Sequence, residues 1–161
     1  HPTASDLRLI MIISKAITDI ERMGDEIERI ARLVTKQKLP SDVAIKSSML
    51  SIGQQAAAMM RGTFDAFARL DEEAALEVYD QDNSIDSEYK KLLSYTADEM
   101  SRSGDSMEDW LEILWALRSL ERIGDRCKNI CEYVVSLTSG RDVRHTPLEN
   151  LQQKLDNISD S

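Results

Sequence analysis

The 161-residue sequence has few of the residues that interrupt helices or shape sheets: six glycines, three prolines, and only 5% aromatic residues. It also lacks an unbroken apolar run of about 18 residues, the length that a membrane-spanning helix requires. The first shortage argues against a β-sandwich or barrel, and the second excludes a membrane span. The composition therefore predicts an all-α protein folded as a helical bundle.

Basic residues and cysteines are also scarce. The 20 Lys and Arg residues against 29 Asp and Glu give a net charge of −9, so we expect no nucleic-acid partner. The two cysteines, Cys127 and Cys131, lie four residues apart in a helical pattern, and no secretory signal is recognisable. We therefore expect a cytoplasmic protein without disulfides, in which both thiols are small core residues rather than zinc ligands.

One motif occurs twice, one hundred residues apart. Glu-Arg-Met-Gly-Asp at residues 21–25 recurs as Glu-Arg-Ile-Gly-Asp at residues 121–125. Both copies lie within apolar patterns of helical period, which predicts two structural repeats that end in equivalent helices. In each copy the Glu and Asp are four residues apart, so they project from one side of the helix.

Apolar periodicity and capping residues predict four helices. They run from Thr3, with Asp6 in a capping box, to about Lys38; from about Val43 to Leu70; from about Glu72 to Arg102; and from Ser106, with Asp109, to about Ser139. The apolar stripe of the first helix contains Ile10, Ile13, Ile17, Ile20, Gly24, Ile27, Ala31 and Val34. Because Gly24 lies on this stripe, we expect a neighbouring helix or a ligand to approach the backbone there.

The third helix carries acids where apolar residues are expected. Asp82 lies in its apolar stripe and Asp86 follows one turn later. If the third and fourth helices face each other in register, these acids meet Glu121 and Asp125, and four carboxylates form an oxygen-rich site suited to a hard divalent cation or to iron. The alternative is that these acids pair with basic side chains on a solvated face, namely Arg118, Arg122, Arg126 and Lys128.

Two enzymatic interpretations find little support. A carboxylate-bundle metalloenzyme normally has Glu-x-x-His pairs, and no histidine lies in any of the four predicted helices. A two-carboxylate hydrolase needs a substrate cleft, which the apolar pattern does not reveal. Before any resemblance is considered, a carboxylate-bundle metalloenzyme, although disfavoured, and a purely structural interaction bundle therefore both remain as alternatives to a binding protein.

The residues carry a family resemblance. The duplicated Glu-Arg-Ile/Met-Gly-Asp motif, the Asn129-Ile130 that follows its second copy, and the Asp82-x-x-x-Asp86 pair resemble the hallmark acid pairs of the PhoU family of bacterial phosphate-uptake regulators. The resemblance covers nearly the whole chain and implies a fold of two three-helix repeats. Residues 1–40 would then be the last helix of a truncated first repeat, 41–140 a complete second repeat, and 141–161 a mobile polar tail.

The resemblance further implies that Asp82, Asp86 and the Glu121/Asp125 pair line a metal site, reported in family members with iron and with other divalent cations. In the first repeat only Glu21 and Asp25 are present, so that site would be incomplete unless another chain supplied acids.

The implied function is that of a cytoplasmic, non-enzymatic adaptor that represses the phosphate-starvation regulon. Its partners would be the phosphate ABC transporter, through its ATPase, and a sensor histidine kinase, with membrane contact only through these proteins. The apolar stripe of the first helix would be bare without the rest of its repeat, so we expect it to pack onto the second unit or onto another chain in a homodimer.

Overall fold

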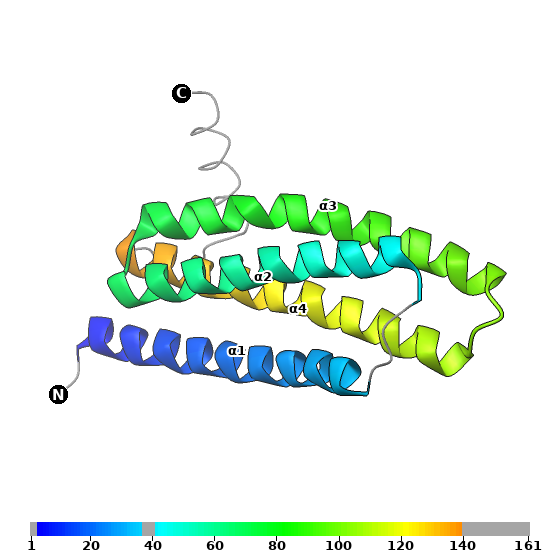
Figure 1. Cartoon of the computed structure of the whole chain (residues 1–161). Helices are drawn as coiled ribbons and strands as arrows, with labels where there is room; N and C mark the ends of the chain where they lie inside the picture. Colours follow the sequence, from blue (N-terminus) through cyan, green and yellow to red (C-terminus); the bar gives the residue numbers. More distant parts are fainter. Residues whose placement is uncertain (1–2, 37–40, 140–161) are drawn as a thin grey trace, which may run out of the picture.

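The computed structural model describes residues 3–36 and 41–139, which form four α-helices and no strand (Figure 1). The helices are α1 (Ala4–Thr35), α2 (Val43–Arg69), α3 (Glu72–Arg102) and α4 (Met107–Thr138). The all-α prediction is confirmed, and the helix ends lie close to those expected. The predicted tail, 141–161, is outside the described residues. No helix in the described part of the chain is long and apolar enough to cross a membrane.

Three of the helices begin at a residue whose side chain caps the first turn. Thr3 and Asp6 form a reciprocal capping box, in which each backbone N–H donates to the other side chain, at 2.9 and 3.3 Å. Asp42 and Asp71 each accept from the backbone N–H three residues on, at 2.9 and 3.0 Å. Ser106 is the N-cap residue of α4, as predicted, although its side chain makes no capping hydrogen bond.

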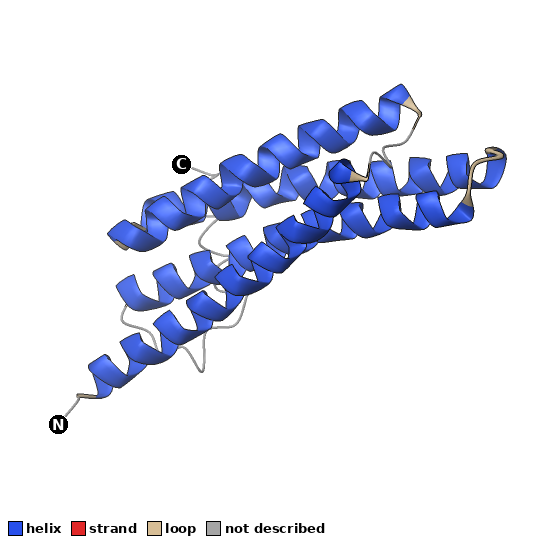
Figure 2. Ribbon diagram, turned by 60° about the horizontal axis from the view of Figure 1, so that its bottom comes forward, coloured by secondary structure: helices blue, strands red, loops and turns tan. Residues whose placement is uncertain are grey.

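Helices α2, α3 and α4 form an antiparallel three-helix unit around one core (Figure 2). Apolar residues at helical spacing on the facing sides of these helices are buried, including Ile52, Met59, Leu92 and Leu117. Each such side chain contributes roughly 1.5–3 kcal/mol when fully buried. The core of this unit is therefore the main source of stability, and it fixes how α3 faces α4.

Helix α1 packs antiparallel along α4 and makes far less contact with α2 and α3. Its polar partners on α4 follow in reverse order, as the pairs Asp19–Asn129, Glu26–Arg122 and Lys36–Glu112 show. In each of these pairs, the α1 residue precedes or follows Gly24 by some number of residues, and its partner lies the same number of residues on the other side of Gly124. The two motif copies therefore lie level with each other, and an approximate two-fold axis relates α1 to α4.

The α1–α4 contact depends on acids that the sequence analysis did not single out. Asp19 is buried, and its Oδ1 accepts from Arg126 Nη1 at 3.0 Å while its Oδ2 accepts from Tyr133 Oη at 2.8 Å. Burial first, and then this hydrogen bond to Asp19, raise the pKa of Tyr133, so the phenol stays protonated as a donor. Glu26, also buried, lies 3.4 Å from Arg122.

Helix α1 buries a different stripe from the one predicted. Ile12, Ala16 and Met23 are almost completely buried, whereas the predicted stripe faces outward, with Ile10 and Ile17 exposed by 60% and 52%. The reason is that α1 is apolar on two sides and α4 covers only one. The expectation that the predicted stripe packs onto the second unit was therefore wrong. No other helix of the described residues approaches Gly24, since nothing outside its own stretch of α1 lies within 4 Å of a Cβ built there; approach by a ligand stays a prediction.

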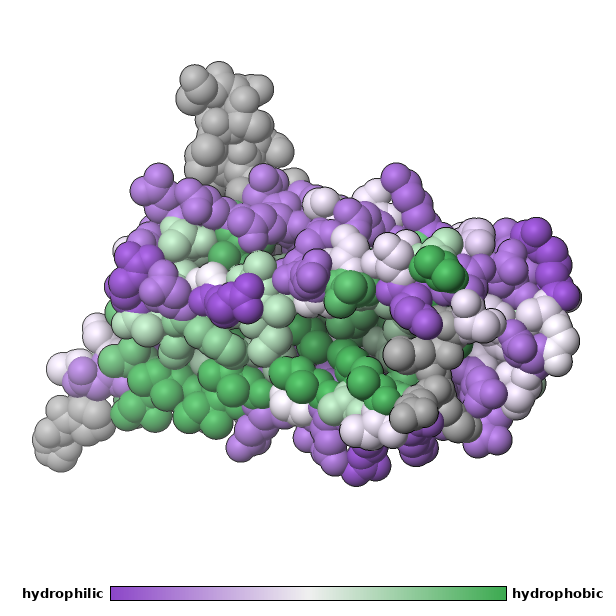
Figure 3. Space-filling model, in the orientation of Figure 1, coloured by the Kyte–Doolittle hydropathy of each residue, from purple (hydrophilic) through white to green (hydrophobic). Residues whose placement is uncertain are grey.

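The exposed stripe of α1 corresponds to a stripe that α4 buries. A shift of one hundred residues places Ile17 on Leu117, Ile20 on Leu120 and Gly24 on Gly124, all three α4 residues being buried in the three-helix unit. Figure 3 shows apolar side chains gathered over the N-terminal half of α1. In the part of the chain that the structure describes, no helix covers this surface, which we call the outer face of α1.

Candidate functional site

Helices α3 and α4 bring the four predicted carboxylates near one another. Desolvation is the largest cause of a raised pKa at Asp125, followed by the negative charges of Glu121 and Asp82, with Asp86 adding to them. Charges act on a pKa in this way only over short distances. We refer to Asp82, Asp86, Glu121 and Asp125 as the acid cluster.

Asp82 is the buried member of the acid cluster, with 6% of the residue exposed. A Cβ on Gly124 would lie 2.8 Å from Asp82 Oδ1, so the carboxylate sits directly over the α4 backbone. Its other oxygen, Oδ2, lies 3.1 Å from the Nζ of Lys128. Two features of α4, a glycine and a lysine four residues apart, therefore hold this carboxylate.

Two other members have cationic partners from their own helices. Asp86 Oδ2 lies 3.2 Å from Lys90 Nζ, and Glu121 is hydrogen-bonded to Arg118. Four carboxylates have the donor chemistry of a hard-cation site. As placed, however, no three His, Cys, Asp or Glu side chains of residues 3–36 and 41–139 converge to hold a metal ion.

The basic residues of α4 divide between its two sides. Arg118 and Lys128 pair with acids of the cluster, as the alternative interpretation of the sequence expects, whereas Arg122 and Arg126 pair with Glu26 and Asp19 of α1. Asn129 likewise donates to Asp19, at 3.4 Å, and so belongs to the α1–α4 contact rather than to the acid cluster.

The incomplete site predicted for the first repeat lies on the outer face of α1. Glu21 and Asp25 are both exposed there, at positions that correspond to Glu121 and Asp125. The described residues place no helix opposite them. Their assignment as half of a second metal site stays a prediction.

The two cysteines are core residues, as predicted. Both are buried, and Cys131 Sγ lies 3.8 Å from Thr63 Oγ1, while Cys127 Sγ lies 3.9 Å from Met23 Sδ. Burial raises the pKa of Cys127 to about 11 and that of Cys131 to about 12. Both thiols are therefore protonated at neutral pH and poor metal ligands or nucleophiles.

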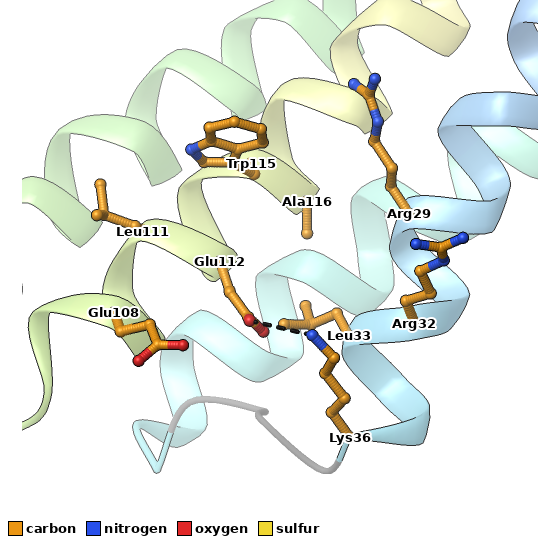
Figure 4. Close-up of a pocket in the computed structure, with 9 residues that line it drawn as sticks. All are labelled: Arg29, Arg32, Leu33, Lys36, Glu108, Leu111, Glu112, Trp115 and Ala116. Atoms are coloured by element: carbon orange, nitrogen blue, oxygen red, sulfur yellow. Dashed lines mark hydrogen bonds and ion pairs between the residues drawn. The ribbon is translucent and has the colours of Figure 1, made fainter.

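A groove of about 450 Å³ lies between the C-terminal end of α1 and the N-terminal half of α4 (Figure 4). Leu33 and Ala116 are its buried apolar part, and Trp115 lies beside them, 65% exposed. Lys36 and Glu112 form an ion pair of 3.4 Å across it. The arginines of its α1 side pair with glutamates of the same helix, so the groove carries no strong net charge.

Comparison with known proteins gives a consistent result. A family model described as "PhoU domain" matches residues 1–34 and 49–134. The phosphate-specific transport system accessory protein PhoU of Edwardsiella tarda is 38% identical over 155 residues, which cover 96% of this chain and 64% of that protein. The chain thus spans just under two thirds of this relative, which is named as an accessory protein rather than as an enzyme.

Solved structures agree with the sequence comparison. The crystal structure of PhoU from Pseudomonas aeruginosa superposes with a TM-score of 0.78 at 40% identity, covering 87% of this chain and 68% of that one. The phosphate transport system regulatory protein PhoU from Streptococcus pneumoniae superposes with a TM-score of 0.75 at 28% identity, covering 87% and 66%.

The paired glycines provide a test of the Asp82 geometry. We expect Gly124→Ala to destabilise the protein by about 1–3 kcal/mol, because the new methyl group overlaps a carboxylate that Lys128 holds in place. We expect Gly24→Ala, the matched substitution on α1 where nothing within the described chain meets the new methyl group, to stabilise the monomer by about 1 kcal/mol through helix propensity. Urea denaturation followed by circular dichroism measures both, and a gain of stability in both variants would contradict the placement of Asp82.

Proposed function

Since this chain belongs to the PhoU family, we propose that it is an accessory protein of a phosphate-specific transport system, acting in the cytoplasm as a non-enzymatic adaptor. It links the transporter's ATPase to the sensor histidine kinase of the phosphate regulon and represses the phosphate-starvation response. The observation that carries this proposal is the family match across the helices α1 to α4, together with both copies of the motif that the match contains.

The shape of the surface supports an adaptor role. The three-helix unit has a closely packed core, while α1 presents a long apolar outer face to its surroundings. Apolar patches of this extent on a soluble protein commonly mark binding surfaces. The chain thus combines a rigid scaffold with an exposed surface that suits protein partners.

Binding measurements test the adaptor role directly. We expect the full 161-residue chain, immobilised for biolayer interferometry, to bind both the phosphate transporter's ATPase subunit and the cytoplasmic part of the histidine kinase. The ATPase subunit of an unrelated ABC transporter serves as the control and should not bind. Because the chain spans only part of its relatives, binding to one of the two partners would retain half of the proposal, and binding to neither would overturn it.

We also propose that the acid cluster takes up a divalent cation or iron. What supports this is the effect of the other three carboxylates on Asp125, together with the burial of Asp82 beside them. Asp82, Asp86 and Glu121 are each ion-paired through one oxygen, so a cation taken up there must compete with these pairs. Glu21 and Asp25 would form a second such site only with acids from a further helix.

Elemental analysis tests the metal site. We expect the purified protein to carry iron or another divalent metal, and an Asp82→Ala/Glu121→Ala variant to lose it, because removal of two of the four carboxylates leaves too few ligands for a hard cation. Ser48→Ala/Ser51→Ala, on the far end of α2, is the control and should keep the metal. The same metal content in all three proteins would exclude this site.

Homodimerisation through the outer face of α1 is part of the same proposal. The stripe there matches a stripe that α4 buries against two helices, so it has the side chains needed to pack against a second copy. An isologous dimer would cover it in both copies at once.

Sedimentation velocity distinguishes a dimer from a monomer. We expect the wild-type chain to sediment as a dimer and Ile17→Glu to sediment as a monomer, because the variant would bury an unpaired carboxylate. The control is Leu50→Glu, which replaces an apolar residue of α2 that is 64% exposed, and which should leave the dimer intact. A monomeric wild type, or a dimer that survives Ile17→Glu, would rule out this interface.

A further inference from the structure

Lys128 occupies an unusual place in the acid cluster. It follows Asp125 by three residues and Glu121 by seven, so it lies on the same side of α4 as these two acids. Its side chain is only 29% exposed, because it extends across the α3–α4 contact toward Asp82. The ammonium also lies over the ring of Tyr79, 5.1 Å from its centroid.

The charge of Lys128 reaches beyond Asp82. Desolvation lowers its pKa, but the hydrogen bond and charge of Asp82, with help from Tyr79 and Asp125, outweigh this and leave the pKa raised. In turn, the ammonium lowers the pKa of Asp125 and Glu132, against the larger effect of their desolvation. One cation thus offsets the negative charge of several acids along this side of α4.

Both oxygens of Asp82 lie close to α4, but in different surroundings. Oδ1 sits over the backbone of Gly124, and Oδ2 accepts from the Lys128 ammonium. Because Oδ1 lies against the α4 backbone at Gly124, we infer that an incoming metal ion would compete with the lysine for Oδ2. The lysine therefore stands in the position from which a cation would bind Asp82.

We propose that the Lys128 ammonium is the resident cation of the acid cluster, so that a divalent metal ion binds there only by displacing it from Asp82. This inference rests on the metal site of the proposed function, and it identifies the Lys128–Asp82 ion pair as the contact that limits the affinity of that site for a metal ion. Asp86 and Glu121 also have cationic partners, but Lys90 is largely exposed and Arg118 lies on the outside of α4. Exposed pairs of this kind break at little cost, whereas the Lys128–Asp82 pair is desolvated on both sides.

Titration of the full chain with Mn²⁺, followed by the electron paramagnetic resonance signal of the free ion, tests this proposal. We expect Lys128→Gln to bind Mn²⁺ about tenfold more tightly than the wild type, because the competing charge is removed. Lys128→Arg keeps the charge and should bind like the wild type. Lys90→Gln removes the exposed partner of Asp86 and should change the affinity by less than about twofold.

A second substitution places the effect at Asp82. Adding Asp82→Asn to Lys128→Gln should abolish the gain in affinity, because the released ligand is then missing. If Lys128→Gln binds no more tightly than the wild type, or if Lys90→Gln gains as much, the proposed role of Lys128 is wrong.

Absence of Mn²⁺ binding in every variant would overturn the metal site of the proposed function, and a separate readout then decides on Lys128. Thermal unfolding of Lys128→Gln, Asp82→Asn and the double variant forms a double-mutant cycle. If the double variant melts well above the temperature obtained by adding the two single shifts to the wild-type value, Lys128 neutralises Asp82 without a metal. Additive effects would refute that as well.

Discussion

Two opposite sides of α4 are buried, one against α1 and the other against α2 and α3, and the arrangement of the whole chain depends on this double burial. It fixes α1 at a level where the two copies of the motif stand side by side. It also brings α3 against the side of α4 that carries Glu121, Asp125 and Lys128. The same helix therefore organises both the scaffold and the candidate site.

The electrostatics of that site follow from the burial of one carboxylate. Asp82 lies where the core pattern calls for an apolar side chain, and a carboxylate in such a place must be paired or protonated. Gly124 provides the room for it and Lys128 provides the charge. Asp86 and Glu121 have partners on their own helices, whereas the ion pair of Asp82 joins α3 to α4.

Helices α1 and α4 are related by an approximate two-fold axis, but their surroundings differ. Helix α4 has its partner helices, whereas the equivalent side of α1 is bare in the described structure and retains the apolar residues needed to bind one. A surface of this kind suits a protein that acts by docking. It also explains why Glu21 and Asp25 repeat the motif without forming a cluster, because their counterparts to Asp82 and Asp86 are missing from the described residues.

The sequence alone determined the four helices, most of their caps, the apolar stripes of α2, α3 and α4, and the duplicated motif, because helical period and capping are local properties of the chain. It also identified Asp82 as a buried acid, since a charge in an apolar stripe is visible in the pattern. Only the tertiary structure decided which side of α1 is buried, because both sides are apolar and the sequence cannot rank them. Likewise, only the packing of α4 between its neighbours decided its ion pairs, in which Arg122 and Arg126 meet Glu26 and Asp19, and Lys128 meets Asp82. Ion pairs between helices depend on how each helix is rotated about its axis and how far it is shifted along its neighbour. Residue spacing within one helix does not encode either.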